Sequence, residues 1–176
     1  MNVRLFVAVA LPRDVRDALA DWRPRDDALR PVATDGLHVT LCFLGWCDED
    51  RAQAIGAAAT ACAAPVGELA VGDALWLPRR RPSVLAVALE DPEGELSALQ
   101  RCVAEAMVDA AGHEPEDRPF LPHVTVARVR RGARAPRGEL PAPPALRFAA
   151  GALTLYRSHL GRGGARYEAL AAAPLR

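Results

Sequence analysis

The chain has 176 residues, a length that fits one domain large enough to bury a core. Hydrophobic residues make up 51% of it and charged residues 25%, which excludes a disordered or fibrous protein. The 22 basic residues balance the 22 acidic ones, so the charge disfavours a protein that coats long nucleic acids. If RNA is the partner, a local end or a single phosphate is the better target.

The first half of the chain predicts strands and helices in alternation. An apolar run with Phe and Val predicts a buried strand over Arg4–Leu11. A helix is expected over Pro12–Trp22, because proline is favoured in a first helical turn. Glycines flank a second expected strand over Leu37–Leu44. An alanine-rich helix capped by its first residue is expected over Asp48–Ala64.

The second half adds mainly strands. Its patterns predict two strands joined by the turn PRRRP, a helix with one apolar face, a strand, a mobile loop rich in Gly and Pro, and two closing strands. In order, these segments are Leu69–Leu77, Ser83–Leu89, Gly94–Ala111, Leu121–Val129, Arg131–Pro144, Ala152–Ser158 and Arg166–Ala172. This mixture of β-α-β units and hairpins predicts an α+β fold with helices outside the sheets.

The absence of lysine and the spacing of the cysteines exclude several kinds of site. All basic residues are arginine, so neither a phosphate-binding loop ending in Gly-Lys nor a lysyl-adenylate intermediate can form. Cys42, Cys47, Cys62 and Cys102 form no C-x-x-C pair, which argues against a zinc site. The N-terminal apolar run is too short to span a membrane and no cleavage site closes it, so we expect a cytoplasmic protein with reduced thiols.

One tetrapeptide occurs twice, as HVTL at His38–Leu41 and as HVTV at His123–Val126, and each copy lies within an expected strand. Successive side chains of a strand point to opposite faces, so the His and Thr of each copy share one face, about 6.6 Å apart. The aliphatic residues point to the other face and can anchor the strand in the core. Two such strands side by side would present two imidazoles and two hydroxyls in one polar patch.

This patch matches the requirements of phosphodiester hydrolysis. In-line attack at phosphorus needs a base on one side and an acid on the other. Imidazole has an unperturbed pKa of about 6.5, so His38 and His123 can hold one proton between them near neutral pH. The hydroxyls of Thr40 and Thr125 can donate hydrogen bonds to the non-bridging phosphate oxygens. The order of acid and base is open at this point, because the motif is symmetric.

Arg128 is a further candidate for phosphate binding. It stands five residues after His123. On a regular strand this odd spacing turns the two side chains to opposite faces, so Arg128 reaches a phosphate only if a bulge or a strand end re-aims it. The aromatic residues Phe6, Tyr156 and Tyr167 could stack a base, but we expect them in the core.

The paired motifs resemble the two His-x-Thr-x signatures of the 2H phosphoesterase superfamily. The resemblance extends over nearly the whole chain and includes the segments RLFVAVALP, GLHVTLCFLG, LPRRRPSVL, RPFLPHVTVARV and LYRSHLGRGGARYEAL. Together these segments resemble the bacterial and archaeal RNA 2′,3′-cyclic phosphodiesterase branch, historically called 2′-5′ RNA ligases.

The resemblance implies one α+β domain over residues 1–176, with two intertwined lobes, pseudo-twofold symmetry, antiparallel sheets that line a central cleft, and helices outside. It also implies hydrolysis of RNA 2′,3′-cyclic phosphate ends to 2′-phosphate ends, without a metal or another cofactor. In the family's usual assignment His38 donates a proton to the leaving 3′ oxygen and His123 activates water. Thr40, Thr125 and Arg128 would bind the phosphate.

The expected partner is an RNA with a 2′,3′-cyclic phosphate end or a cyclic nucleotide, bound by a monomer away from any membrane. The reverse reaction would join a cyclic end to a 5′-hydroxyl through a 2′-5′ bond and would need no ATP. The alternative is a module that binds nucleotides or RNA ends without turnover. A structural or partner-binding domain would need a large exposed apolar surface, and nothing in the sequence points to one.

Overall fold

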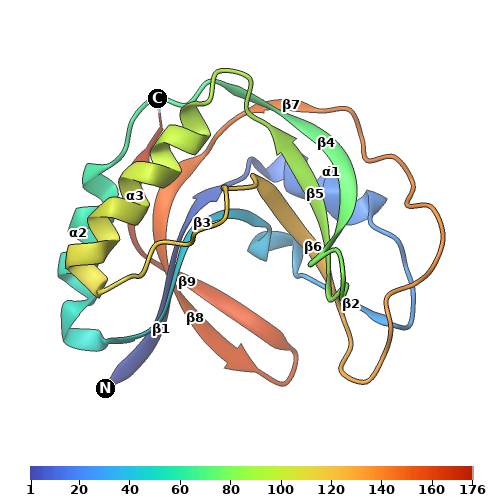
Figure 1. The fold of residues 1–176 in the computed structure, drawn as a ribbon, viewed down its shortest axis with the longest axis horizontal. Helices are drawn as coiled ribbons and strands as arrows, with labels where there is room; N and C mark the ends of the chain where they lie inside the picture. The colour runs from blue at the N-terminus through green and yellow to red at the C-terminus, as the bar shows by residue number, and fades with distance from the viewer. Residues whose placement is uncertain (176) are drawn as a thin grey trace.

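The computed structural model describes residues 1–175, which form two antiparallel sheets with helices packed outside them (Figure 1). The four-stranded sheet has the order β3-β1-β8-β9, and every neighbouring pair is antiparallel. Its strands are β1 over Asn2–Ala10, β3 over His38–Asp48, β8 over Ala152–Gly161 and β9 over Gly164–Pro174.

The five-stranded sheet has the order β2-β6-β5-β4-β7 and is also antiparallel throughout. Its strands are β2 over Leu29–Pro31, β4 over Glu68–Leu77, β5 over Val84–Glu90, β6 over His123–Val129 and β7 over Arg147–Ala149. The motifs lie on β3 and β6. Counted outward from these two strands, β3-β1-β8-β9 and β6-β5-β4-β7 repeat one four-strand pattern, to which β2 adds a strand beside β6. The motif strands β3 and β6 contact each other.

The helices lie outside the sheets (Figure 1). Helices α2 over Ala52–Ala61 and α3 over Glu95–Ala111 pack together against the four-stranded sheet. Helix α3 is followed by the capping residue Gly112, whose φ of 69° suits glycine. Helix α1 over Arg13–Trp22 lies on the side of the five-stranded sheet, and 3₁₀ turns at Thr34–Gly36 and Glu49–Arg51 flank β3.

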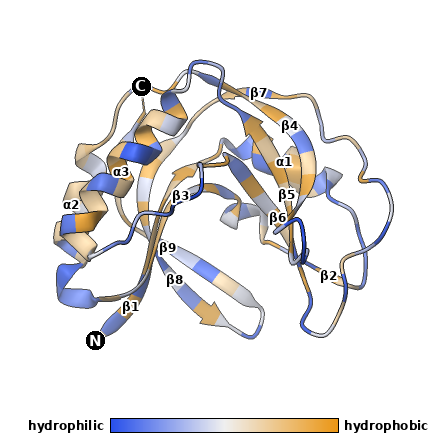
Figure 2. Cartoon of the chain, in the orientation of Figure 1, coloured by the Kyte–Doolittle hydropathy of each residue, from blue (hydrophilic) through white to orange (hydrophobic). Residues whose placement is uncertain are grey.

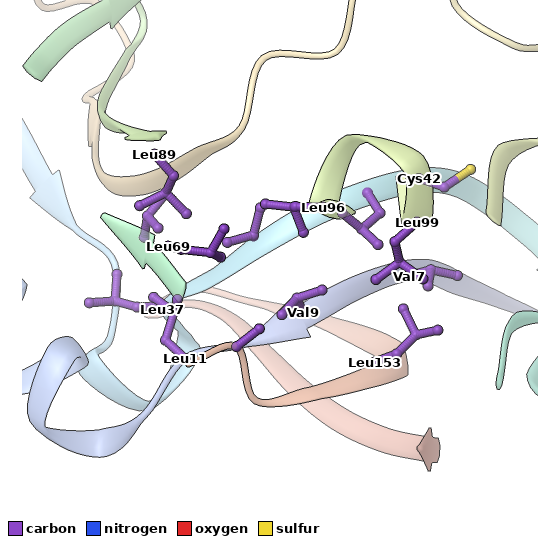
Figure 3. Close-up of a cluster of buried hydrophobic side chains, with 14 of the residues drawn as sticks. Val7, Val9, Leu11, Leu37, Cys42, Leu69, Leu89, Leu96, Leu99 and Leu153 are labelled. Atoms are coloured by element: carbon purple, nitrogen blue, oxygen red, sulfur yellow. The ribbon is translucent and has the colours of Figure 1, made fainter. Parts of the chain in front are cut away.

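One hydrophobic core joins the two sheets (Figure 3). Figure 2 shows that β1 is hydrophobic along most of its length. Helix α3, in contrast, has both polar and apolar residues on its surface. The core side chains come from β1, β4, β5 and α3, among other elements; they include Val7, Val9, Leu69, Leu89, Leu96 and Leu99. Because both sheets contribute to one close-packed core, their motif strands are held in a fixed relation to each other.

The expected α+β fold with antiparallel sheets is confirmed, and Arg131–Pro144 contains neither helix nor strand, as expected. The helix expected over Asp48–Ala64 is wrong at both ends. Asp48 caps a 3₁₀ turn by accepting from the backbone N–H of Asp50, and α2 begins only after that turn. Strands β2 and β7 were not expected, because three residues leave no readable alternation.

Candidate active site

The two motif strands meet at a cleft of about 370 Å³. All residues that the sequence proposed as a site line this cleft: His38, Thr40, His123, Thr125 and Arg128. The first two come from β3 and the other three from β6. Val39 and Val124 are fully buried on the opposite faces, as the strand alternation predicts.

Both histidine rings are fixed by the same backbone contact. Nδ1 of His38 lies 2.7 Å from the carbonyl oxygen of Gly36, and Nδ1 of His123 lies 2.7 Å from that of Leu121. A carbonyl oxygen can only accept, so Nδ1 carries the hydrogen in each ring. Nε2 is therefore the atom of each imidazole that can exchange a proton with a ligand.

Three aromatic rings surround His38. The ring centroids of Phe6, Tyr167 and Tyr156 lie 4.9, 5.2 and 6.2 Å from the imidazole centroid. Tyr167 meets the imidazole edge-on at 88° and also packs on Gly36, where an added Cβ would lie 3.2 Å from its ring. These rings remove water from the imidazole without offering it a counter-charge.

This environment lowers the pKa of His38 from 6.5 to about 4. Burial is the main cause, the hydrogen bond to Gly36 opposes it, and the positive charges of Arg128 and His123 add to the lowering. The imidazole is therefore neutral at pH 7 in the ligand-free protein.

The hydroxyl of Thr40 contacts the other ring nitrogen of His38. Its Oγ1 lies 3.1 Å from Nε2 of His38. Because the neutral ring carries its hydrogen on Nδ1, Thr40 is the donor and Nε2 the acceptor in this hydrogen bond. The hydroxyl can turn toward a phosphate oxygen once Nε2 is protonated and has no lone pair to offer.

A β-bulge brings Arg128 into the cleft. Along β6 and β5, Thr125 pairs with Ala86 but Ala127 pairs with Leu85, so Val126 is an extra residue on β6. Val126 and Ala127 are both buried, and the alternation resumes with Arg128 on the cleft side. The sequence analysis required a bulge or a strand end for Arg128 to reach the phosphate, and this bulge is present.

Strand β3 has a bulge at the matching position. Thr40 pairs with Ala8 and Cys42 with Val7, so Leu41 is the extra residue. Phe43, five residues after His38, therefore lies on the cleft side, with 48% of its surface exposed. The guanidinium carbon of Arg4 lies 4.7 Å from the centroid of the Phe43 ring.

Comparison with known proteins gives the family. Residues 11–162 match the 2′-5′ RNA ligase superfamily. The chain belongs to this superfamily. The RNA 2′,3′-cyclic phosphodiesterase of Escherichia coli (strain K12) is 33% identical over 173 residues, which cover 95% of this chain and 93% of the relative. The Thermus thermophilus protein of the same name is 34% identical over 181 residues, which cover 96% and 88%.

Solved structures of superfamily relatives have the same fold. E. coli LigT complexed with 3′-AMP superposes with a TM-score of 0.83 at 31% identity and covers 99% of both chains. A second solved structure, of a T. thermophilus protein, gives a TM-score of 0.79 at 27% identity and covers 98% of both chains. The expected two-sheet architecture of a 2H phosphoesterase is thereby confirmed.

The cleft of this superfamily member is cationic. Arg4, Arg30 and Arg128 line it together with the two histidines, and no Asp or Glu of residues 1–175 is among its lining side chains. The formal net charge of the whole chain is zero, whereas the cleft lining has three arginines and no carboxylate, so the local charge at the cleft is positive. This distribution favours an anionic ligand.

Several lining residues escaped the sequence analysis. Arg30 lies opposite Arg128 in the β2–β6 pair, and the short β2 gave no signal for it. Phe6 is buried, as expected, but also borders the cleft beside His38. The core position expected for Tyr167 is wrong, because this residue lines the cleft. The shared spacing of Phe43 and Arg128 from their histidines was the one sequence signal that could have revealed Phe43.

Three further findings concern residues 1–175 as a whole. No helix in this range is long and apolar enough to cross a membrane. No group of three or more His, Cys, Asp or Glu side chains within it is placed to hold a metal ion. Cys42, Cys47, Cys62 and Cys102 are all free thiols.

Proposed function

We propose that this chain hydrolyses RNA 2′,3′-cyclic phosphate ends to 2′-phosphate ends, with His38 and His123 as its acid–base pair. One observation carries the proposal: two HVT motifs from different sheets line one cleft whose other charged side chains are all arginine. The name RNA 2′,3′-cyclic phosphodiesterase, which relatives from two bacteria bear, supports the same substrate for this chain.

In the proposed reaction the cyclic phosphate lies between the two imidazoles. Nε2 of His123 accepts a proton from a water molecule while the water oxygen forms a new bond to phosphorus. The bond from phosphorus to the 3′ oxygen breaks on the opposite side, and Nε2 of His38 gives its proton to that oxygen. The product has a 2′-phosphate and a 3′-hydroxyl, and solvent returns the proton from His123 to His38.

The acid of this reaction must gain its proton when the substrate arrives. His38 is neutral in the ligand-free cleft, because its pKa is about 4. A cyclic phosphate carries one negative charge, which stabilises an imidazolium and offsets the repulsion from Arg128. Thr40 is then released from Nε2 and can donate to a phosphate oxygen. We therefore propose that substrate binding and protonation of His38 are coupled.

The phosphate itself would be held by Thr40, Thr125 and Arg128. The two hydroxyls lie on the same strand faces as the histidines and can donate to the non-bridging oxygens, where charge increases during attack. The guanidinium of Arg128 can donate two parallel hydrogen bonds to the same group. Support for these roles comes from the common cleft and from the charge of its lining.

The test uses a short RNA that ends in a 2′,3′-cyclic phosphate, incubated with pure protein in EDTA and followed by phosphorus NMR. Conversion to a 2′-phosphate by the wild type but not by His123→Ala is the expected result. A 3′-phosphate product would reverse the assignment of the leaving oxygen. If the cyclic end stays intact while calorimetry shows tight binding of the RNA, the protein is a binding module without turnover and not an enzyme.

The same experiment can detect the reverse reaction. Microscopic reversibility allows the acid–base pair to join a cyclic end to the 5′-hydroxyl of a second RNA, so adding that RNA in excess would give a 2′-5′ linked product. Hydrolysis should dominate, because water is far more abundant than RNA ends.

We further propose that the chain acts as a single-domain monomer in the cytoplasm and without a metal. The common core of the two sheets supports one cooperative unit, and the free thiols suit a reducing compartment. Light scattering should give the monomer mass, thermal unfolding should show one transition, and activity should be unchanged in EDTA.

A further inference from the structure

The bulge at Val126 is held by hydrogen bonds from two other segments of the chain. The backbone N–H of Val32, the residue after β2, donates to the carbonyl oxygen of Val126 at 3.0 Å. Nη1 of Arg23 donates to the same carbonyl at 3.3 Å and also to the carbonyl of Val32. One guanidinium thus bridges two backbone carbonyls on segments that are far apart in sequence, at the point where β6 leaves regular pairing.

Arg23 is well placed to hold this point still. It follows the last residue of α1, and its own N–H donates to the carbonyl of Leu19 at 3.1 Å. Val15 and Leu19 bury the inner face of that helix in the core. The side chain therefore extends from a fixed helix end, and charge strengthens its hydrogen bonds to the carbonyls.

The matching bulge on β3 has a similar contact. Nε2 of Gln100, on α3, donates to the carbonyl of Leu41 at 3.4 Å. Leu41 is the extra residue of β3, as Val126 is of β6. In both halves of the fold a side chain within or directly after a helix thus binds the carbonyl of the bulged residue, so the contact of Arg23 is part of a repeated arrangement.

Arg23 does not itself line the catalytic cleft. It lines a second cavity, of about 800 Å³, together with Leu29, Pro31 and Ala127. Ala127 separates this side of β6 from Arg128, which faces the catalytic cleft. Any effect of Arg23 on a phosphate in that cleft therefore acts through the two backbone segments that it binds, β6 at Val126 and the chain directly after β2 at Val32.

We infer that Arg23 is a positioning residue whose guanidinium holds the bulge at Val126 and thereby keeps Arg128 on the cleft side. The inference rests on the proposed function, because it gives Arg128 the phosphate as its ligand. Without this contact the bulge can relax toward regular pairing, and regular alternation turns Arg128 away from His123.

The test is a double-mutant cycle with Arg23→Met and Arg128→Met, read as kcat/KM on the cyclic-ended RNA and as affinity for inorganic phosphate. Arg23→Met should lower both by about tenfold, the loss expected when the charged hydrogen bonds of Arg128 to the phosphate are no longer made. In the Arg128→Met background the same change should have little further effect. Arg23→Lys should recover part of the loss, because an ammonium can still donate to a carbonyl.

Arg25→Met is the matched control, because exposed Arg25 borders the same second cavity and should leave both readouts within twofold of the wild type. The inference fails if the fold losses caused by Arg23→Met and Arg128→Met multiply in the double variant. It also fails if folded Arg23→Met binds phosphate as tightly as the wild type. If Arg23→Met does not fold, the same cycle is run with Arg23→Lys.

Phosphate affinity needs no turnover, so the two proposals can fail separately. A wild type that binds phosphate but leaves the cyclic RNA intact would overturn the proposed hydrolysis alone. If the fold losses of phosphate affinity multiply in the double variant, only the positioning role of Arg23 is overturned.

Discussion

The two motif strands share one backbone plan but place their histidines in different surroundings. On β3 and on β6 alike, Nδ1 binds the carbonyl two residues earlier and a bulge follows the threonine. His38, however, is enclosed by aromatic rings. The first side chain that faces the cleft after the bulge on β3 is Phe43. On β6, the first side chain that faces the cleft after the bulge is Arg128.

This comparison separates geometry from proton affinity. The repeated backbone contacts give both rings the same tautomer, whereas the aromatic enclosure, present around His38 alone, lowers the proton affinity of that ring. A symmetric scaffold can in this way carry two different chemical roles. Four predictions test how far the difference between the two halves extends.

The largest effect should come from removing either imidazole. His38→Ala and His123→Ala should each lower kcat by about 10³-fold, since a positioned general acid or base contributes 10²–10⁴-fold. The double variant should be hardly slower than the single ones, because the two groups act as a unit. Single-turnover assays on the cyclic-ended RNA would measure this, with His113→Ala as the control. A double loss equal to the product of the single losses would contradict a joint role.

The acid stability of the protein should depend on His38. Between pH 6.5 and pH 4 the unfolded state binds the proton of this histidine and the folded state does not, so the free energy of unfolding falls as the pH is lowered. The contribution of neutral His38 is complete above pH 6.5 and lost below pH 4, and it amounts to about 3 kcal/mol.

Urea unfolding of wild type and His38→Gln at several pH values would test this. The variant should lose less stability on acidification, and the other titrating groups cancel in the difference between the two proteins. Parallel pH profiles would show that the aromatic enclosure does not lower the proton affinity of His38.

The first cleft-facing residue after each bulge is Arg128 on β6 and Phe43 on β3, and only Arg128 should contribute to phosphate affinity. Arg128→Met should weaken the binding of inorganic phosphate by about tenfold, because a charged hydrogen bond to phosphate contributes about 1.5–3 kcal/mol. Phe43→Met should weaken it much less, since a phenyl ring carries no charge. Calorimetry with phosphate at one ionic strength would measure both. Equal losses would mean that the two halves bind the phosphate alike.

The smallest effect is the proton taken up with the substrate. In an inactive His123→Ala background, 2′,3′-cyclic AMP should bind near pH 6 with an uptake of up to about one proton, because its negative charge raises the pKa of His38 toward the ordinary value. Calorimetry in two buffers of different ionisation enthalpy would measure this. The uptake should vanish when His38→Gln is added to that background, and its persistence would locate the proton elsewhere.

The sequence was sufficient to predict the two motif strands and to predict that their His and Thr side chains face one cleft. Alternation along HVTL and HVTV placed each His–Thr pair on one face, and the aliphatic residues did anchor the other face. The repeat itself predicted that the two faces would act together. These features depend on local geometry, which a short pattern records.

Other features depend on contacts between distant segments and could not be predicted. The bulge at Val126 shows only in the register of β6 against β5. Arg30 enters the cleft on a strand too short to show alternation, and Tyr167 borders it from the far end of the chain. The depressed pKa of His38 arises from burial that only the packed structure creates.

The rings around His38 also give the two imidazoles distinguishable signals in spectroscopy. Protons near an aromatic face or edge experience its ring current, so the carbon-bound protons of His38 should resonate away from the usual imidazole positions. His123 has no such ring neighbour within residues 1–175. Proton NMR could therefore distinguish His38 from His123 in one unlabelled sample and observe the His38 ring as a ligand enters.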